Sequence, residues 1–228
     1  MAIAVLQELI DKQDNWEIVR DQIAAILVAE RDNQMALAPG EGKNPADWDF
    51  DVYVERSNPW EKWLNGDVAN PVVDIKPIVA IWIDNSSFDG SKSNAVERQT
   101  ENAIYNIDCY GFGVAKSDGA TGQIAGDKAA AFERDKAVKL VRNILMASQN
   151  LHLQLKGLVG KRWPNSLNFF QPEQDGNTVQ QVAACRVSFE AQFNEFSPQY
   201  VPETLEIVGV ELNHDNKVID LVYNYPIP

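Results

Sequence analysis

The side chains best suited to chemistry in this sequence are two cysteines and two histidines. Cys109 and Cys185 stand in segments where apolar and polar residues alternate, each with apolar neighbours on its own side, which is typical of buried, unreactive thiols. We expect both thiols to be free, because nothing in the chain indicates secretion. His152 and His214 have no other histidine or cysteine at ligand spacing, so a transition-metal site is not expected. A cysteine–histidine nucleophile pair stays open at this point, because the sequence does not show which elements meet.

Three alternating aspartates look like the start of a calcium-binding loop. Asp47, Asp49 and Asp51 have the spacing of its first, third and fifth positions. The sixth position holds Val52 instead of the glycine of the sharp turn, and the twelfth holds Asn58 instead of the bidentate glutamate. We therefore expect a solvated acidic segment here and no calcium site.

Sequence motifs for phosphate binding and acyl transfer are incomplete or missing. Gly111 and Gly113 form a G-x-G without the third glycine that a dinucleotide site needs, and the sequence holds neither a P-loop nor a G-x-S-x-G motif. We therefore expect no cofactor, no metal ion and no catalytic residues, and hence a protein that is not an enzyme.

The charge of the chain is large and unevenly distributed. The 228 residues include 33 acidic and 20 basic side chains, a formal net charge of −13. This balance argues against general binding to nucleic acids or anionic membranes, which are polyanions. No apolar run approaches the roughly 18 residues of a membrane-spanning helix, and the N-terminus is not expected to be a signal peptide. Residues 127–163 differ from the rest, with eight basic and three acidic side chains.

Hydrophobic periodicity predicts two helices and several strands. The first helix covers residues 15–29, where Asp14 as N-cap and Glu17 form a capping box, and the second covers residues 127–149. Strands are predicted at 50–55, 72–83, 96–110, 178–194, 205–212 and 218–223. The strand at 178–194 is unusually long, so we expect a bulge in it or a projection beyond the domain. The order of elements predicts an α+β fold, a mainly antiparallel sheet with helices packed on one face, as a single domain over residues 1–228.

A long segment near the N-terminus lacks this regular pattern. Residues 38–71 are rich in glycine and proline, which marks irregular chain. They also hold Trp48, Trp60 and Trp63, and this density of tryptophan indicates that the segment is anchored on the core or on a partner. We predict an irregular arm and favour an interface for its tryptophans.

Two smaller groups are further interface candidates. Residues 84–95 are polar and predict a projecting loop, which includes Phe88. Arg162 and Trp163 follow the second helix and are expected at a helix-to-strand corner with the tryptophan in the core. The alternative is an interface anchor, because tryptophan and arginine are favoured at binding hot spots.

Five stretches of the sequence together carry a resemblance to a known family. They are IWIDNSSFDGSKSNAVERQ (81–99), YNIDCYG (105–111), RDKAVKLVRNILMAS (134–148), KRWPNSLNFFQP (161–172) and CRVSFEAQFNEFSPQ (185–199). In this order and spacing they resemble tail-terminator or tail-completion proteins of long-tailed bacteriophages, over about residues 15–212. The resemblance implies a structural virion protein, assembled in the host cytoplasm, that forms a hexameric ring at the head-proximal end of the tail. Such a ring stops growth of the tail tube and provides the joint to the neck and head.

The resemblance also implies the partners. They are further copies of the chain, the tail tube protein, neck or connector proteins and, in a contractile tail, the sheath protein, with no membrane. DNA only passes through the lumen, and we hypothesise that an acidic lumen repels it. A neck adaptor or a baseplate component is an alternative. An enzyme or small-ligand module with an acidic pocket is an alternative of another class.

The basic helix is the candidate ring contact. A closed ring needs two different, complementary patches on each subunit. We hypothesise that Lys128, Arg134, Lys139 and Arg142 contact an acidic surface of the adjacent subunit or ring. The alternative is a solvated helix face, since exposed charge pairs contribute only about 0–1 kcal/mol.

Overall fold

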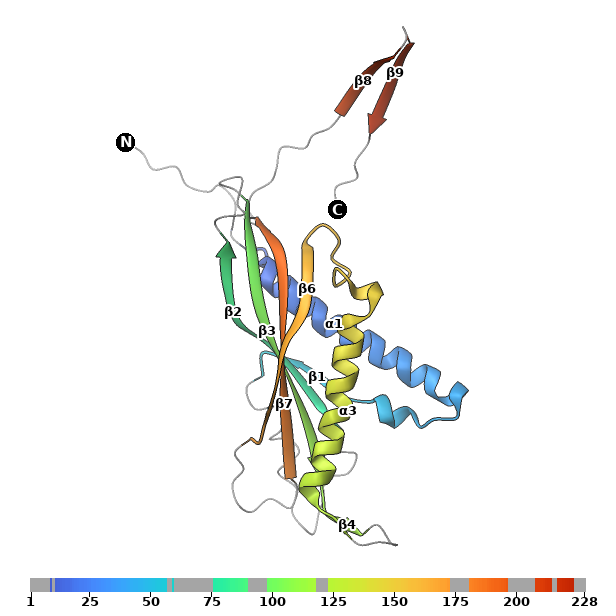
Figure 1. The fold of residues 1–228 in the computed structure, drawn as a ribbon, viewed down its shortest axis with the longest axis vertical. Helices are drawn as coiled ribbons and strands as arrows, with labels where there is room; N and C mark the ends of the chain where they lie inside the picture. Colours follow the sequence, from blue (N-terminus) through green and yellow to red (C-terminus); the bar gives the residue numbers. More distant parts are fainter. Residues whose placement is uncertain are drawn as a thin grey trace, which may run out of the picture. The chain divides into compact units, whose positions relative to one another are not determined.

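The chain forms two compact units. The computed structural model describes residues 9, 11–56, 59, 76–89, 98–117, 123–172, 181–196, 208–214 and 217–223 (Figure 1). One unit extends from Gln13 to Ser197, and the other combines Met1–Lys12 with Pro198–Pro228. In the second unit, β8 (Val208–His214) and β9 (Lys217–Tyr223) pair as an antiparallel hairpin, close to the two strands predicted there. The single domain over 1–228 stays a prediction.

A five-stranded sheet is the centre of the larger unit. Its order is β1-β2-β3-β7-β6, in which β1 runs parallel to β2 and every other neighbouring pair is antiparallel. The strands are β1 (Asp51–Val54), β2 (Ile78–Asp89), β3 (Arg98–Gly113), β6 (Val159–Phe170) and β7 (Gln181–Phe196). Two short strands, β4 (Lys116–Ser117) and β5 (Gln123–Ile124), pair separately. The predicted α+β class with a mainly antiparallel sheet is confirmed.

The two longest strands, β3 and β7, pair with each other along their whole length. Each has 16 residues, and the register runs from Arg98 opposite Phe196 to Gly113 opposite Gln181. Each strand therefore satisfies the backbone hydrogen-bonding groups of the other. The unusual length of β7 is matched by the equal length of β3. The register between these two strands has no bulge.

The helices are α1 (Asn15–Leu37) and α3 (Gly126–Met146), and short 3₁₀ turns follow each of them. The backbone N–H of Asp14 donates to the Glu17 carboxylate at 2.9 Å, so the predicted capping box starts α1. The helix continues past its predicted end at residue 29, because no helix breaker occurs before Pro39 and Gly42, whose φ is +69°. The turns are η1 (Ala38–Glu41), η2 (Pro45–Trp48) and η3 (Ser148–Asn150).

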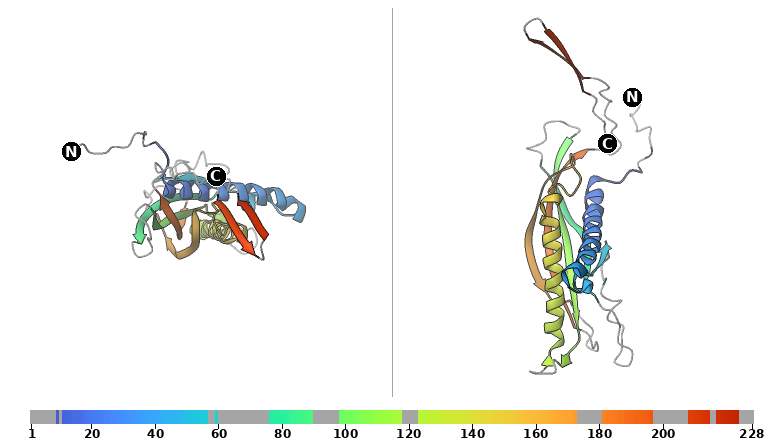
Figure 2. Two further views of the ribbon diagram at one scale, coloured as in Figure 1. Left: turned by 90° about the horizontal axis from the view of Figure 1, so that it is seen from above. Right: turned by 90° about the vertical axis from the view of Figure 1, so that its right-hand side faces the viewer.

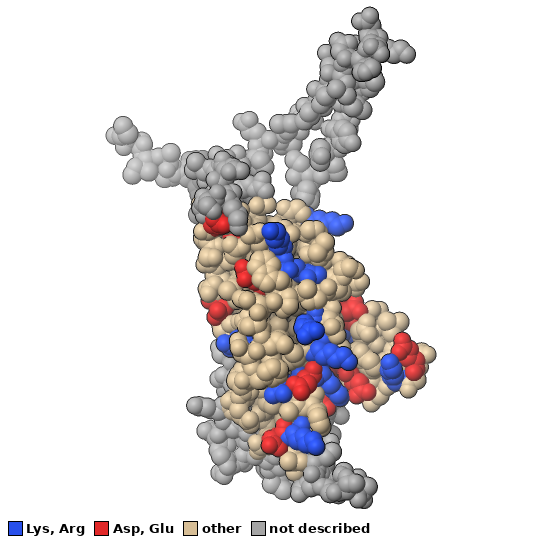
Figure 3. Space-filling model, in the orientation of Figure 1, with Lys and Arg blue, Asp and Glu red and all other residues tan. Residues whose placement is uncertain are grey.

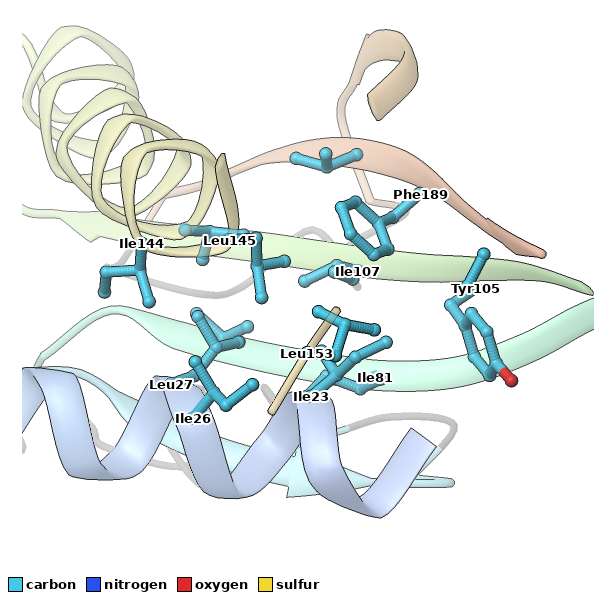
Figure 4. Packing of buried hydrophobic residues seen from close by; sticks show 14 of the residues in the cluster. Ile23, Ile26, Leu27, Ile81, Tyr105, Ile107, Ile144, Leu145, Leu153 and Phe189 are labelled. Atoms are coloured by element: carbon cyan, nitrogen blue, oxygen red, sulfur yellow. The ribbon is translucent and has the colours of Figure 1, made fainter. Parts of the chain in front are cut away.

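Both helices cover the same face of the sheet and form the core with it. The buried side chains of α1 recur at helical spacing, and those of α3 meet them over the odd-numbered residues of β3 and β7 (Figures 2 and 4). The core includes Ile23, Leu27, Val141, Leu145, Tyr105, Ile107, Val187 and Phe189. Gly111 and Gly113 let α3 lie directly against β3, because a Cβ atom at either position would overlap the backbone of α3.

Three sequence predictions differ from the structure. The segment around Arg162 is not a corner but the strand β6, which ends the sheet. The predicted loop at 84–95 is wrong for residues 84–89, which continue β2, and residues 90–95 lie outside the described residues. The strand predicted at 72–83 begins at Ile78. In the irregular arm, Trp60 and Trp63 lie outside the described residues, whereas residues 38–56 are described and form η1, η2 and β1.

Among the described residues, no helix is apolar over a length sufficient to cross a lipid bilayer.

Candidate interaction surfaces

The two cysteines lie opposite each other inside the core. Cys109 of β3 faces Cys185 of β7 in the register, and both are free and fully buried. Burial raises the pKa of Cys109 well above its ordinary value and that of Cys185 to about 11. Thiols of this kind are poor nucleophiles, as their apolar sequence neighbours predicted. His152 is not their partner, because its Nδ1 lies 2.8 Å from the carbonyl oxygen of Val159.

The three alternating aspartates are neutralised by lysines. Lys76 lies 3.2 Å from Asp49 and 3.0 Å from Asp51, and Lys136 of α3 lies 3.3 Å from Asp47. These ion pairs tie the segment after α1 to β1 and α3. Within the described residues, no cluster of three or more histidine, cysteine or acidic side chains has the arrangement of a metal site.

The outer face of α3 adjoins a depression on the side of α1. It has a volume of about 560 Å³ and lies between the C-terminal half of α1, η2 and α3. Trp48 lines it from η2, with Lys43 stacked 5.9 Å from its ring, and Lys139 lines it from α3. The structure therefore brings together two residues that the sequence proposed separately as interface candidates.

A second depression, of about 660 Å³, lies on the other side of α3, towards the end of β6. Its lining includes Arg134, Lys139 and Arg142 from α3 and Phe169 from β6. Arg134 forms an ion pair with Asp135 at 2.8 Å and stacks 4.7 Å from the ring of Phe169. Phe169 is 58% exposed, which is unusual for phenylalanine, and the sequence analysis missed it.

Lys139 and Arg142 are cations of this face without an acidic partner among the described residues. Both are exposed, and neither forms an ion pair within the described part of the chain, in contrast to Arg134 and Lys136. Figure 3 shows basic side chains gathered over α3, with acidic ones among them. Lys128 is also exposed, with its ammonium 5.8 Å from the ring of Phe132.

The remaining interface candidates lie elsewhere. Arg162 is 9% exposed, and its guanidinium donates to the carbonyl oxygens of Asn150 at 2.5 Å and Ala147 at 2.9 Å. It therefore anchors the end of α3 to β6, which favours the structural interpretation. Trp163 is half-buried on the opposite face of β6, whereas Phe88 is 57% exposed near the end of β2. Their interface roles stay predictions.

The sheet face opposite the helices carries a polar and aromatic cluster that the sequence analysis did not find. Arg186 of β7 donates to both carboxylate oxygens of Asp108, at 2.8 and 2.9 Å. Its guanidinium also stacks 4.7 Å from the ring of Trp82 and 5.7 Å from that of Phe170. Trp82 Nε1 donates to the same carboxylate at 3.1 Å, and burial raises the pKa of Tyr110 beside it. The cluster borders a depression of about 360 Å³.

Further polar pairs continue along this face from β3 to β7. Ser188 donates to Asn106 at 3.0 Å, and Gln192 donates to Asn102 at 2.8 Å. With the Arg186–Asp108 pair they form a polar ladder, which is interrupted where Ile104 stands opposite Glu190. No described helix packs on this ladder. In the sequence, the ladder is marked only by the polar residues that alternate with apolar ones along β3 and β7. This alternation does not show which polar residues pair with each other.

Comparisons with known proteins give a distant structural likeness. No protein-family model and no curated protein matches the chain. Among solved structures, the chain is similar to the sheath/tube terminator of an extracellular contractile injection system, PVC, in its extended state, at 12% identity and a TM-score of 0.31. The match covers 90% of this chain and 66% of that chain, so this protein spans slightly less than two thirds of the terminator's length. The likeness is one of outline only.

Proposed function

We propose that the protein is a non-enzymatic structural component of a phage tail that forms a ring, hexameric as in the family it resembles. In this role it ends the tail tube at the head-proximal side, provides the joint to the neck and contacts the sheath where the tail is contractile. The proposal combines the sequence resemblance with the surface chemistry of α3.

The observation that carries the proposal is the unneutralised basic face of α3 between two aromatic-lined depressions. Trp48 lies on one side and Phe169 on the other, with Lys139 on the lining of both depressions. Tryptophan, phenylalanine and arginine are the residue types enriched in the centres of protein interfaces. An exposed aromatic–cationic surface of this kind fits an acidic protein partner better than it fits solvent.

A second copy of the chain supplies the acidic surface that this face requires. Outside residues 127–163 the chain carries 30 acidic and 12 basic side chains, whereas this segment has a net charge of +5. Two surfaces of opposite sign on one subunit favour head-to-tail contacts, which close into a ring when the rotation between copies allows it.

Charge reversal on α3 tests the proposal. We expect Lys139→Glu/Arg142→Glu to weaken self-association at least about tenfold, because like charges then meet across the contact. Light scattering coupled to size-exclusion chromatography at several concentrations measures the change. The matched control is Arg56→Glu/Lys156→Glu, which changes the net charge equally at two exposed cations that line neither depression beside α3.

The control variant should assemble as the unmodified protein does. If the α3 variant forms normal rings, α3 is not part of the contact between copies. A protein that stays monomeric at all concentrations, and also on purified tube ends, would overturn the ring proposal itself.

Electron microscopy of particles labelled on this protein tests its position. Label at the head-proximal end of the tail supports a terminator. Label within the neck or at the baseplate supports the two alternatives of the same class. A reconstruction of the ring also tests the acidic lumen, since a lumen lined by basic side chains would contradict it.

The enzyme alternative, with an acidic pocket, has less support from the described depressions. Their carboxylates are engaged by neighbouring groups: Asp108 by Arg186, Asp47 by Lys136 and Glu55 by Arg20. A carboxylate held in an ion pair is less available to contact a substrate.

A further inference from the structure

The main sheet has an exposed strand edge on each side. On one side β6 is the last strand. On the other side β1 pairs only with Ile78–Ile81 of β2, so no described strand lies beside β2 from Asp84 to Phe88. These five residues are all exposed. Exposed edges present unpaired backbone N–H and C=O groups and are ready to pair with another strand.

The exposed parts of the two edges lie at the same level of the sheet. Ser87 of β2 stands opposite Asn102 of β3, which stands opposite Gln192 of β7, and Gln192 stands opposite Lys161 of β6. One row thus crosses the four strands from edge to edge. Gly160 and Lys161 are exposed at their end of this row.

Other features limit the available stretch of β6 to Gly160–Trp163. Before it, the carbonyl oxygen of Val159 lies 2.8 Å from the Nδ1 atom of His152. After it, Pro164 has no N–H group, and the register shifts between Pro164 and Ser166. The four residues that remain match the length of the stretch from Asn85 to Phe88 at the other edge.

Strand direction makes the two edges complementary. Each of the four strands β2, β3, β7 and β6 is antiparallel to the next. Since three reversals separate β2 from β6, these two strands are antiparallel to each other. A second copy placed in line therefore brings its β6 antiparallel to the β2 of the first copy, and the alternation continues without interruption.

The charges of the two edges also agree with pairing. Asp84 begins the exposed stretch of β2, whereas Lys161 lies in that of β6. A contact of this kind is head-to-tail, so each copy uses its two edges for two different neighbours. When such contacts close into a ring, neither of these two stretches remains a free edge that could cause uncontrolled aggregation.

We propose that Asn85–Phe88 of β2 pairs, as an antiparallel strand, with Gly160–Trp163 of β6 in a second copy of this chain, so that the sheet continues from copy to copy. This contact rests on the proposed ring and specifies which backbone elements form it.

Thiol cross-linking between copies tests the pairing. Ser87→Cys and Lys161→Cys place thiols on the same sheet face, at exposed positions of the two edges. Native Cys109 and Cys185 are buried and should not react. We expect Ser87→Cys/Lys161→Cys, treated with a short bis-maleimide, to give a ladder of covalent oligomers on a denaturing gel. A second test pair is Asn85→Cys/Lys161→Cys, in which the β2 thiol is moved by two residues on the same face. It should react if the register between the copies is shifted by two residues.

The matched control is Ser87→Cys/Asn168→Cys. Asn168 is an exposed residue of β6 on the same sheet face. Across the sheet it stands in one row with Arg186 of β7, Asp108 of β3 and Ala80 of β2. At Ala80 the edge of β2 is already paired with β1, so no second copy can pair there. This control should give at least about tenfold less cross-linked product. Equal cross-linking of the control and the test pairs would show random collision and overturn the pairing.

Light scattering of the same samples separates the failure of this pairing from that of the ring. Discrete oligomers without cross-links in either test pair would overturn the pairing and leave the ring standing. Monomers without cross-links would overturn both. Selective cross-links within discrete oligomers support both.

Discussion

The two faces of the central sheet are built from alternate residues of the same strands, yet they differ in almost every physical respect. The odd-numbered residues of β3, such as Tyr105 and Ile107, are apolar and lie under two helices. The even-numbered residues Asn102, Asn106 and Asp108 pair with polar residues of β7. Hydrophobic burial dominates the first face. The second combines directional hydrogen bonds with a smaller buried apolar cluster, which includes Ile78, Tyr110 and Val182.

This difference separates residues that make the fold from residues that remain available for contacts. A helix-covered face tolerates little change of volume, because its packing is dense. On the opposite face Asn106 and Asp108 are buried, whereas the half-buried Asn102 and Gln192 and the exposed ring of Phe170 keep surface that a partner can contact. Variants on the two faces should therefore differ in how much stability they lose and in whether a second substitution restores it.

The largest expected loss comes from Gly111→Ala on the helix-covered face. The added Cβ overlaps the backbone of α3 at Ala130 and Arg134, so the helix must move away from β3. We expect the free energy of unfolding to fall by about 3 kcal/mol in urea denaturation. Gly40→Ala is the control, since no atom lies within 4 Å of its new Cβ, and it should change stability by less than about 0.5 kcal/mol. Equal stability of the two variants would refute close packing of α3.

A smaller loss, of about 2 kcal/mol, is expected from Arg186→Met on the opposite face. The substitution removes the guanidinium and leaves the Asp108 carboxylate, with 4% of its side chain exposed, without its ionic partner. Adding Asp108→Asn should restore about 1 kcal/mol, because the amide oxygen still accepts from Trp82 and no buried charge remains. Thermal and urea unfolding of both variants measure this coupling, with Arg142→Met as the control. Strictly additive losses would contradict a coupled cluster.

The smallest effect concerns the thiols of the helix-covered face, and it appears only at high pH. Burial raises the pKa of Cys185 from its ordinary value of 9.0 to about 11. The unfolded chain therefore ionises first, and stability present below pH 9 is lost as the pH rises towards 11. Stability measured from pH 8 to 11 should fall less steeply for Cys185→Ala than for the unmodified protein. Identical slopes, or rapid reaction of native thiols with Ellman's reagent at pH 8, would show that solvent reaches this face.

The covered half of the fold could be predicted from the sequence. Val187 and Phe189 alternate with polar residues along β7, and Asp14 with Glu17 marked the start of α1. These signals are local and come from burial on one side, which is the feature that hydrophobic periodicity detects. The apolar surroundings of Cys109 and Cys185 predicted their inert character for the same reason.

The edges and the polar face could not be predicted in the same way. β6 contains Pro164 and two shifts of register, which break the alternation that marks a strand. Residues 84–88 of β2 are exposed and all but Phe88 are polar, so their composition is that of a loop. The pairing of Asp108 with Arg186 joins residues 78 positions apart, and only the strand order brings them together. The candidate surface on α3 was partly predictable from charge, whereas its neighbour Phe169 depended on the position of β6.

Arg162 has a mechanical consequence. It belongs to the edge strand and holds the final carbonyl groups of α3, so the edge and the helix are joined by a side chain as well as by the chain between them. A force applied along β6 by an attached neighbour would pass into α3 and, through the close contact at Gly111, into β3. The sheet and α3 would then share the load, and the force would not separate β6 alone from the sheet.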